Sequence, residues 1–200
     1  KMAALGFQEQ ISYSFVAEEE EADFSAVKNP IKVLNPIASQ MAVMRTQLIA
    51  GLVNTLKYNL NRKTERAALF EYGRVFFRDE TVKGSDFAVE GVRQPVHLGA
   101  LVYGSAFPAQ WGEKVRPDVE QLTAGRKLRF EKSKNPALHP GRSADVYLDG
   151  DLIGVIGELH PALAQKYDLP HSPVVFELDA EPLLKQGLPV HKLISKFQPV

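Results

Sequence analysis

Residues Asn35 to Phe76, NPIASQMAVMRTQLIAGLVNTLKYNLNRKTERAALFEYGRVF, contain the pattern that decides the fold. Leucines recur every four residues from Leu48 to Leu60, which predicts a helix with one apolar face. The helix contains Gly51, a weak helix former, so it needs support from packing against other parts of the chain. A buried strand is predicted directly after it, over residues 67–77.

The rest of the chain predicts short strands with irregularly placed helices, an arrangement that favours an α+β domain on a largely antiparallel sheet. The dipeptide Asp149-Gly150 is a strong hairpin signal, because its turn needs positive φ angles. Gly99 interrupts one of the predicted strands. Further strands are expected at residues 31–34, 96–103, 127–133, 144–148, 152–156 and 174–178, and further helices at 18–24, 118–123, 161–167 and 181–186.

Residues 8–16 alternate between apolar and polar side chains. Ile11, Tyr13 and Phe15 fall on one side, and serines fall on the other. This period of two predicts a half-buried strand with its apolar side turned inward.

Composition excludes several classes of protein. Lys+Arg and Asp+Glu are both 24, so the formal net charge is zero, which argues against general electrostatic binding to nucleic acid. The absence of cysteine excludes zinc–thiolate sites and cysteine nucleophiles, and it fits a cytoplasmic protein. No apolar run approaches membrane-spanning length, so no membrane contact is expected.

The five histidines show none of the spacings HxH, HxxxH or HExxH, so no metal site is predicted. His139 and His160 each precede a proline. We expect their side chains to close local turns by hydrogen bonding.

Several phrases, in order along the chain, resemble the beta subunit of bacterial phenylalanyl-tRNA synthetase. They are LGFQEQISYSFV near the N-terminus, Asn35-Pro36 with Met44-Arg45-Thr46 and Asn59-Leu60-Asn61-Arg62, FEYGRVF from Phe70, LHPGRSA from Leu138, and GVIGELHP from Gly154. The resemblance implies a class II aminoacyl-tRNA synthetase-like antiparallel sheet flanked by helices. It implies one catalytic-like core domain over residues 1–200, cut from a longer chain. Arg116-Pro117 runs directly into Asp118 where the family usually carries a longer phrase. Either the natural loop is shorter here or residues are missing near residue 117, and we expect the second.

The resemblance also implies a partner, the alpha subunit of the synthetase. The residues expected at this contact are Arg45, Ile49, Leu52, Val53, Leu56, Asn59 and Arg62. The alternative for the four apolar residues is a role in the core alone. Arg74 is a further polar residue expected to matter there. The alternative for Arg45 and Arg74 is a structural ion pair with a residue such as Glu71.

Catalysis by this chain is not expected. Working class II synthetases carry an Arg-containing strand, which Arg74 to Glu80 resembles, and later a Gly-rich strand that leads into a helix opening with Arg. With Gly157 to Pro161 as the reference point, those glycines fall on Glu177 and Asp179, and the arginine falls on Pro182. Side chains would then fill the nucleotide slot, and two carboxylates would repel phosphate. No catalytic or cofactor-binding residue is therefore predicted.

The function implied is a structural and interaction module of phenylalanine-tRNA ligase. By resemblance, the whole enzyme is a heterotetramer that joins phenylalanine to its tRNA and uses ATP and magnesium. No cofactor is expected in this fragment, and tRNA is reached through the whole enzyme. Two alternatives remain: an active class II-like ligase domain, and a free-standing tRNA-binding domain.

Overall fold

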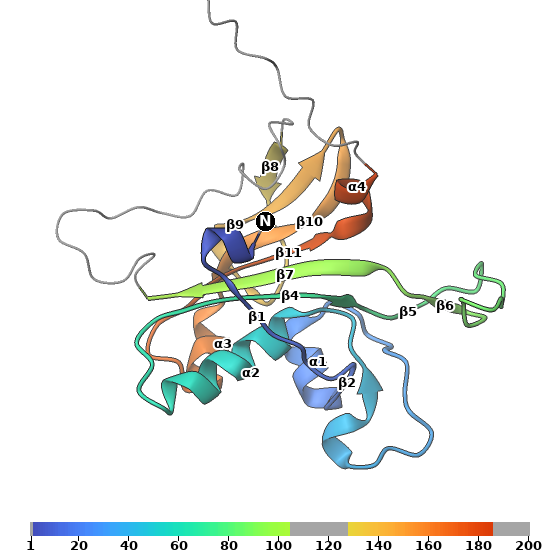
Figure 1. The fold of residues 1–200 in the computed structure, drawn as a ribbon, viewed down its shortest axis with the longest axis horizontal. Coiled ribbons are helices and arrows are strands. Elements are labelled where there is room, and N and C mark those ends of the chain that lie inside the picture. The colour runs from blue at the N-terminus through green and yellow to red at the C-terminus, as the bar shows by residue number, and fades with distance from the viewer. Residues whose placement is uncertain (1, 105–127, 186–200) are drawn as a thin grey trace, which may run out of the picture.

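The computed structural model describes residues 2–104 and 128–185. Its centre is a seven-stranded sheet (Figure 1) in the order β1-β4-β7-β11-β10-β9-β8. Strand β1 is parallel to β4, and the five other neighbouring pairs are antiparallel. The bounds are β1 Gln8–Glu9, β4 Ala67–Arg74, β7 Val96–Tyr103, β8 Leu128–Lys132, β9 Leu138–Leu148, β10 Asp151–Leu159 and β11 Val174–Asp179. The predicted α+β fold with a largely antiparallel sheet is confirmed.

Two small sheets and short helices complete the described part of the chain. One small sheet joins β2 (Phe15–Val16) to β3 (Val43–Met44), and the other joins β5 (Phe77–Arg78) to β6 (Val92–Arg93). The helices are η1 Ala3–Leu5, α1 Glu18–Phe24, η2 Ser39–Met41, α2 Ile49–Leu60, α3 Pro161–Lys166 and α4 Ala180–Leu184. None of the helices in residues 2–104 and 128–185 is long and apolar enough to cross a membrane.

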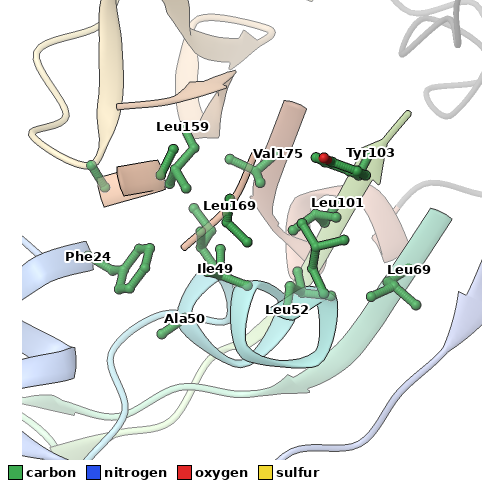
Figure 2. Close-up of a cluster of buried hydrophobic side chains, with 14 of the residues drawn as sticks. Phe24, Ile49, Ala50, Leu52, Leu69, Leu101, Tyr103, Leu159, Leu169 and Val175 are labelled. Atoms are coloured by element: carbon green, nitrogen blue, oxygen red, sulfur yellow. The ribbon is translucent and has the colours of Figure 1, made fainter. Parts of the chain in front are cut away.

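Helix α2 supplies the centre of the core. Its apolar face packs against one face of the sheet, where Figure 2 shows Ile49 and Leu52 gathered with Leu101 and Leu159. Each fully buried leucine contributes about 1.5–3 kcal/mol to folding by leaving water. The alternate side chains of the same strands, such as Phe70, face the other way and form a second buried cluster. The leucine repeat therefore marks the residues that join α2 to the sheet.

Gly99 has a different role from the predicted one. Strand β7 runs through it without interruption. A Cβ at this position would lie 2.9 Å from the Cβ of Leu48 and 3.2 Å from the Cδ1 of Leu52. The missing side chain is what allows α2 to approach the sheet so closely.

The β9–β10 hairpin forms as predicted. Asp149 and Gly150 have φ angles of 53° and 100°, which the turn requires. Gly157 in β10 lies against Ser143 of β9, since a Cβ at Gly157 would be 2.6 Å from the Ser143 Cβ. A Cβ at Gly154 would collide with the carbonyl oxygen of Glu177 in β11. These two glycines let the three strands pair closely.

Most other predicted elements agree with the structure. The expected helices near residues 18–24, 161–167 and 181–186 are α1, α3 and α4. The strand predicted at residues 31–34 is wrong, because only Lys32 forms an isolated bridge, to Val43. The helix predicted at 118–123 and the missing loop predicted near residue 117 lie outside the described residues.

Candidate partner-binding surface

The segment between β1 and β2 presents its apolar side chains to solvent. Ile11 is 92% exposed, Tyr13 is 74% exposed and Phe15 is 42% exposed. The chain pairs as a strand only at residues 8–9 and 15–16. The predicted half-buried strand over residues 8–16 is therefore wrong in extent, and wrong in the side that faces the core.

The polar side of this segment faces inward because two buried charges need partners there. Gln10 Nε2 donates to Glu71 Oε2 at 3.0 Å, and Ser12 Oγ donates to the same oxygen at 2.7 Å. The backbone N–H of Arg45 donates to the carbonyl oxygen of Ser14 at 2.9 Å. Burial of polar groups is stabilising only when their hydrogen bonds are made, which fixes this orientation of the segment.

Arg45 and Glu71 form the ion pair at the centre of this network. Their Nη1 and Oε1 atoms are 2.6 Å apart, and the side chains are only 6% and 3% exposed. Arg45 also donates from Nε to the carbonyl oxygen of Arg74 at 2.9 Å and from Nη1 to Ser12 Oγ at 2.9 Å. The structural ion pair considered from the sequence is thus confirmed for Arg45. The Arg74 side chain is exposed and donates to the Gln94 carbonyl oxygen at 3.0 Å.

The network holds Glu71 in its ionised form. Burial alone would raise the pKa of the Glu71 carboxyl, but hydrogen bonds from Gln10 and Ser12 and the charge of Arg45 outweigh it. The pKa of Glu71 therefore lies below its ordinary value.

Two glycines make room for these polar groups. A Cβ at Gly51 in α2 would lie 2.6 Å from Ser12 Oγ, and a Cβ at Gly73 in β4 would lie 2.5 Å from Arg45 Nη2. The weak helix former in α2 is thus explained by the polar segment that crosses beside it. Besides the Arg45–Glu71 pair considered above, Gly51 in α2 and Gly73 in β4 were sequence signals of this site.

Two more apolar side chains are exposed in the segment that runs towards β3. Leu34 and Ile37 are both 96% exposed. They follow residues 31–33, which bond to β3, and β3 pairs in turn with β2. We call Ile11, Tyr13, Phe15, Leu34 and Ile37 the outward apolar surface.

The residues predicted at a partner contact are mostly in the core. Ile49, Leu52, Val53 and Leu56 are at most 2% exposed and pack against the chain's own sheet, which is the second role left open for them. Arg45 is buried in its ion pair.

The two remaining predicted contact residues lie near the end of α2. Asn59 is half-buried and donates to the Thr55 carbonyl oxygen at 2.9 Å. Arg62 is exposed, with its guanidinium 3.3 Å from the centre of the Tyr58 ring. A partner contact by these two residues stays a prediction.

The two carboxylates on the predicted nucleotide slot have structural partners. Glu177 Oε2 accepts a hydrogen bond from the Leu48 N–H at the start of α2, at 2.8 Å, and its Oε1 lies 2.6 Å from His97 Nδ1. Asp179 accepts from the Glu181 N–H at 2.9 Å and caps α4. The Glu177 side chain is buried beside the start of α2. The slot-filling role inferred from the sequence for Glu177 and Asp179 stays a prediction.

His139 and His160 close local turns as expected. His139 Nδ1 accepts from the Gly141 N–H at 3.0 Å, and His160 Nδ1 accepts from the Ala162 N–H at 3.2 Å at the start of α3. Both histidines are thus accounted for by backbone hydrogen bonds.

Comparison with known proteins identifies the family to which this chain belongs. Residues 1–180 match the family described as the phenylalanyl tRNA synthetase beta chain CLM domain. The chain belongs to this family. The resemblance seen in the sequence phrases is confirmed.

Close relatives agree with the family match. The phenylalanine–tRNA ligase beta subunit of Burkholderia lata is 49% identical over 207 residues, covering 100% of this chain and 26% of the relative. The corresponding subunit of Neisseria meningitidis serogroup B is 47% identical over 208 residues, covering 100% of this chain and 25% of that protein. The chain thus spans about a quarter of the length of these relatives.

A solved structure shows the same fold. A pyrrolysyl tRNA synthetase, PylSc of Desulfitobacterium hafniense, matches with a TM-score of 0.60 at 15% identity, covering 92% of this chain and 63% of that chain. The predicted class II synthetase-like fold is confirmed.

Proposed function

We propose that this chain is the interaction core of a phenylalanine–tRNA ligase beta subunit, and that its work is to hold the alpha subunit of that enzyme. The proposal is supported by membership of the family and by relatives named as beta subunits, a name that implies a partner subunit. The observation that carries it is the outward apolar surface.

That surface has the properties of a protein contact. Isolated exposed apolar side chains are ordinary on a soluble domain, but here an extended segment turns its whole apolar side outward. Tyr13 and Phe15 are aromatic residues of the kind enriched at the centre of interfaces. The Arg45–Glu71 network fixes the segment before a partner arrives, so little conformational freedom is lost on binding.

The chemistry is assigned to the partner. Under this proposal the whole ligase is a cytoplasmic heterotetramer that uses ATP and magnesium to join phenylalanine to its tRNA, and this chain does not catalyse the reaction. In its support, Glu177 and Asp179 are the residues on which the sequence register places the glycines of class II synthetases, and both carboxylates accept hydrogen bonds from backbone N–H groups of this chain.

Two assays on the same preparation test the proposal. The chain alone should show no phenylalanine-dependent pyrophosphate exchange with ATP, and it should co-purify with the alpha subunit. Pyrophosphate exchange by the chain alone would favour an active ligase domain. Failure to bind the alpha subunit, together with a salt-dependent shift of tRNA, would favour a tRNA-binding domain.

A further inference from the structure

Residues 77–93 form an arm that projects from the sheet. Strands β5 and β6 pair through Phe77 with Arg93 and Arg78 with Val92, and they continue the line of β4 and β7. Figure 1 shows this ribbon, at the right, extending beyond the helices and the other strands. The arm therefore offers a convex tip to its surroundings.

Backbone hydrogen bonds connect the two sides of the tip. Asp79 N–H donates to the Gly91 carbonyl oxygen at 2.9 Å, and Gly91 N–H donates to the Val82 carbonyl oxygen at 3.0 Å. Ser85 and Ala88 exchange two backbone hydrogen bonds of 2.9 and 3.3 Å across the final turn. All of these bonds join residues of the arm to one another.

The base of the arm is held by side chains. The guanidinium of Arg93 lies 4.8 Å from the centre of the Phe77 ring, and its Nε is 3.9 Å from Asp79 Oδ2. The Phe77 ring in turn lies 6.3 Å from that of His97 in β7. Side-chain contacts thus connect the base of the arm to strand β7 of the sheet.

The tip presents an aromatic side chain to solvent. Phe87, inside the final turn, is 96% exposed, and Val89 beside it is 60% exposed. Neither residue adds to the core, so the fold of the described residues does not require an apolar side chain at either position. Burial of such a ring in a partner's pocket would remove apolar surface from water.

The charges around Phe87 indicate the kind of partner. Between residues 79 and 91, the charge of Asp79 is paired with that of Arg93. The other charged residues in this range are three acidic ones, Glu80, Asp86 and Glu90, and one basic one, Lys83. A net negative tip repels nucleic acid. It complements a protein surface that carries Lys or Arg.

We propose that Phe87 inserts into an apolar pocket with a basic rim on the partner subunit of the same ligase, the alpha subunit. A convex tip needs a concave partner. One aromatic side chain and its neighbours bury much less than the roughly 1,200 Å² of a stable interface. The contact at Phe87 is therefore an additional one between subunits that a larger interface already holds together. In naming the alpha subunit, the inference rests on the proposed function.

Photo-cross-linking in the assembled ligase tests this assignment. A benzophenone-bearing phenylalanine is placed at position 87 of the full-length beta subunit, and in a matched control at position 152, where Leu152 is also exposed. The expected product joins position 87 to a peptide of the partner subunit that contains apolar and basic residues. A cross-link to tRNA, a cross-link within the same chain, or no yield above that of position 152 would overturn the proposal.

Affinity measurements separate this inference from the proposed function. Phe87→Ser in the full-length chain should raise the dissociation constant for the partner subunit about tenfold, as loss of an interface anchor does, while Leu152→Ser leaves it unchanged. An unchanged constant for Phe87→Ser would overturn the arm contact, whatever the outward apolar surface does. If Phe87→Ser weakens binding and Tyr13→Ser does not, the arm contact stands and the outward apolar surface is rejected.

Discussion

Arg45 and Glu71, 26 positions apart in the sequence, form a buried ion pair that orients the segment between β1 and β2. Glu71 also accepts from Gln10 and Ser12, so the polar side of that segment is turned inward. The apolar side chains Ile11 and Tyr13 then face solvent. One polar contact inside the domain thus determines which side chains of this segment face solvent.

Removing one member of this pair should destabilise the domain strongly. Arg45→Met leaves the Glu71 carboxylate buried without its cation, which costs about 3–5 kcal/mol of unfolding free energy. Arg142→Met is the matched control, because the Arg142–Glu158 pair is 2.7 Å long but exposed, and such pairs contribute about 0–1 kcal/mol. Urea unfolding of the two variants measures the difference. Equal losses would show that the buried pair has no special role.

The contribution of Glu71 should depend on pH. Its pKa is lower in the folded state than its ordinary value of 4.5, so the native state favours the carboxylate more than the unfolded state does. The resulting stability is complete above the unfolded pKa and is lost as pH falls through the folded one. The difference in unfolding free energy between the natural chain and Glu71→Gln should therefore shrink below pH 4.5. Urea titrations across this range check it, and a difference that stays constant would contradict the assignment.

Gly99 should tolerate no side chain, because α2 lies directly over it. Gly99→Ala places a Cβ 2.9 Å from the Leu48 Cβ, and overpacking of this kind costs about 1–3 kcal/mol. Gly84→Ala is the control, since its new Cβ would meet Glu90 at an ordinary 3.5 Å. Thermal unfolding should show a lower midpoint for Gly99→Ala alone. An unchanged midpoint for both variants would mean that α2 is not seated on the sheet as described.

Local patterns predicted the parts of the fold that local chemistry determines. The leucine repeat of α2 and the Asp149-Gly150 turn are both patterns in which neighbouring residues alone determine the local structure. Alternation between Ile11 and Phe15 gave the period of the segment but not which side is buried. Which side is buried depends on the hydrogen bond from Ser12 to Glu71, 59 positions away. The sequence around residue 12 does not indicate this long-range contact.

The candidate site was harder to predict for the same reason. The apolar period of α2 identified Ile49, Leu52, Val53 and Leu56 as one face, but it did not say whether that face meets the chain's own sheet or a partner. The exposed Leu34 and Ile37 lie in a segment with no regular period, where exposure follows from the pairing around β3. Only three-dimensional neighbours distinguish these cases.

The affinity of the chain for the alpha subunit, with and without Tyr13→Ser, tests the central claim most directly. Tyr13 is 74% exposed and its side chain makes no contact in the core clusters, so the variant should unfold like the natural chain. Titration calorimetry should then show about a tenfold or greater loss of affinity, as for an aromatic residue in the centre of an interface. An affinity equal to that of the natural chain, with Leu152→Ser as the matched control, would contradict the claim that the outward apolar surface holds the partner.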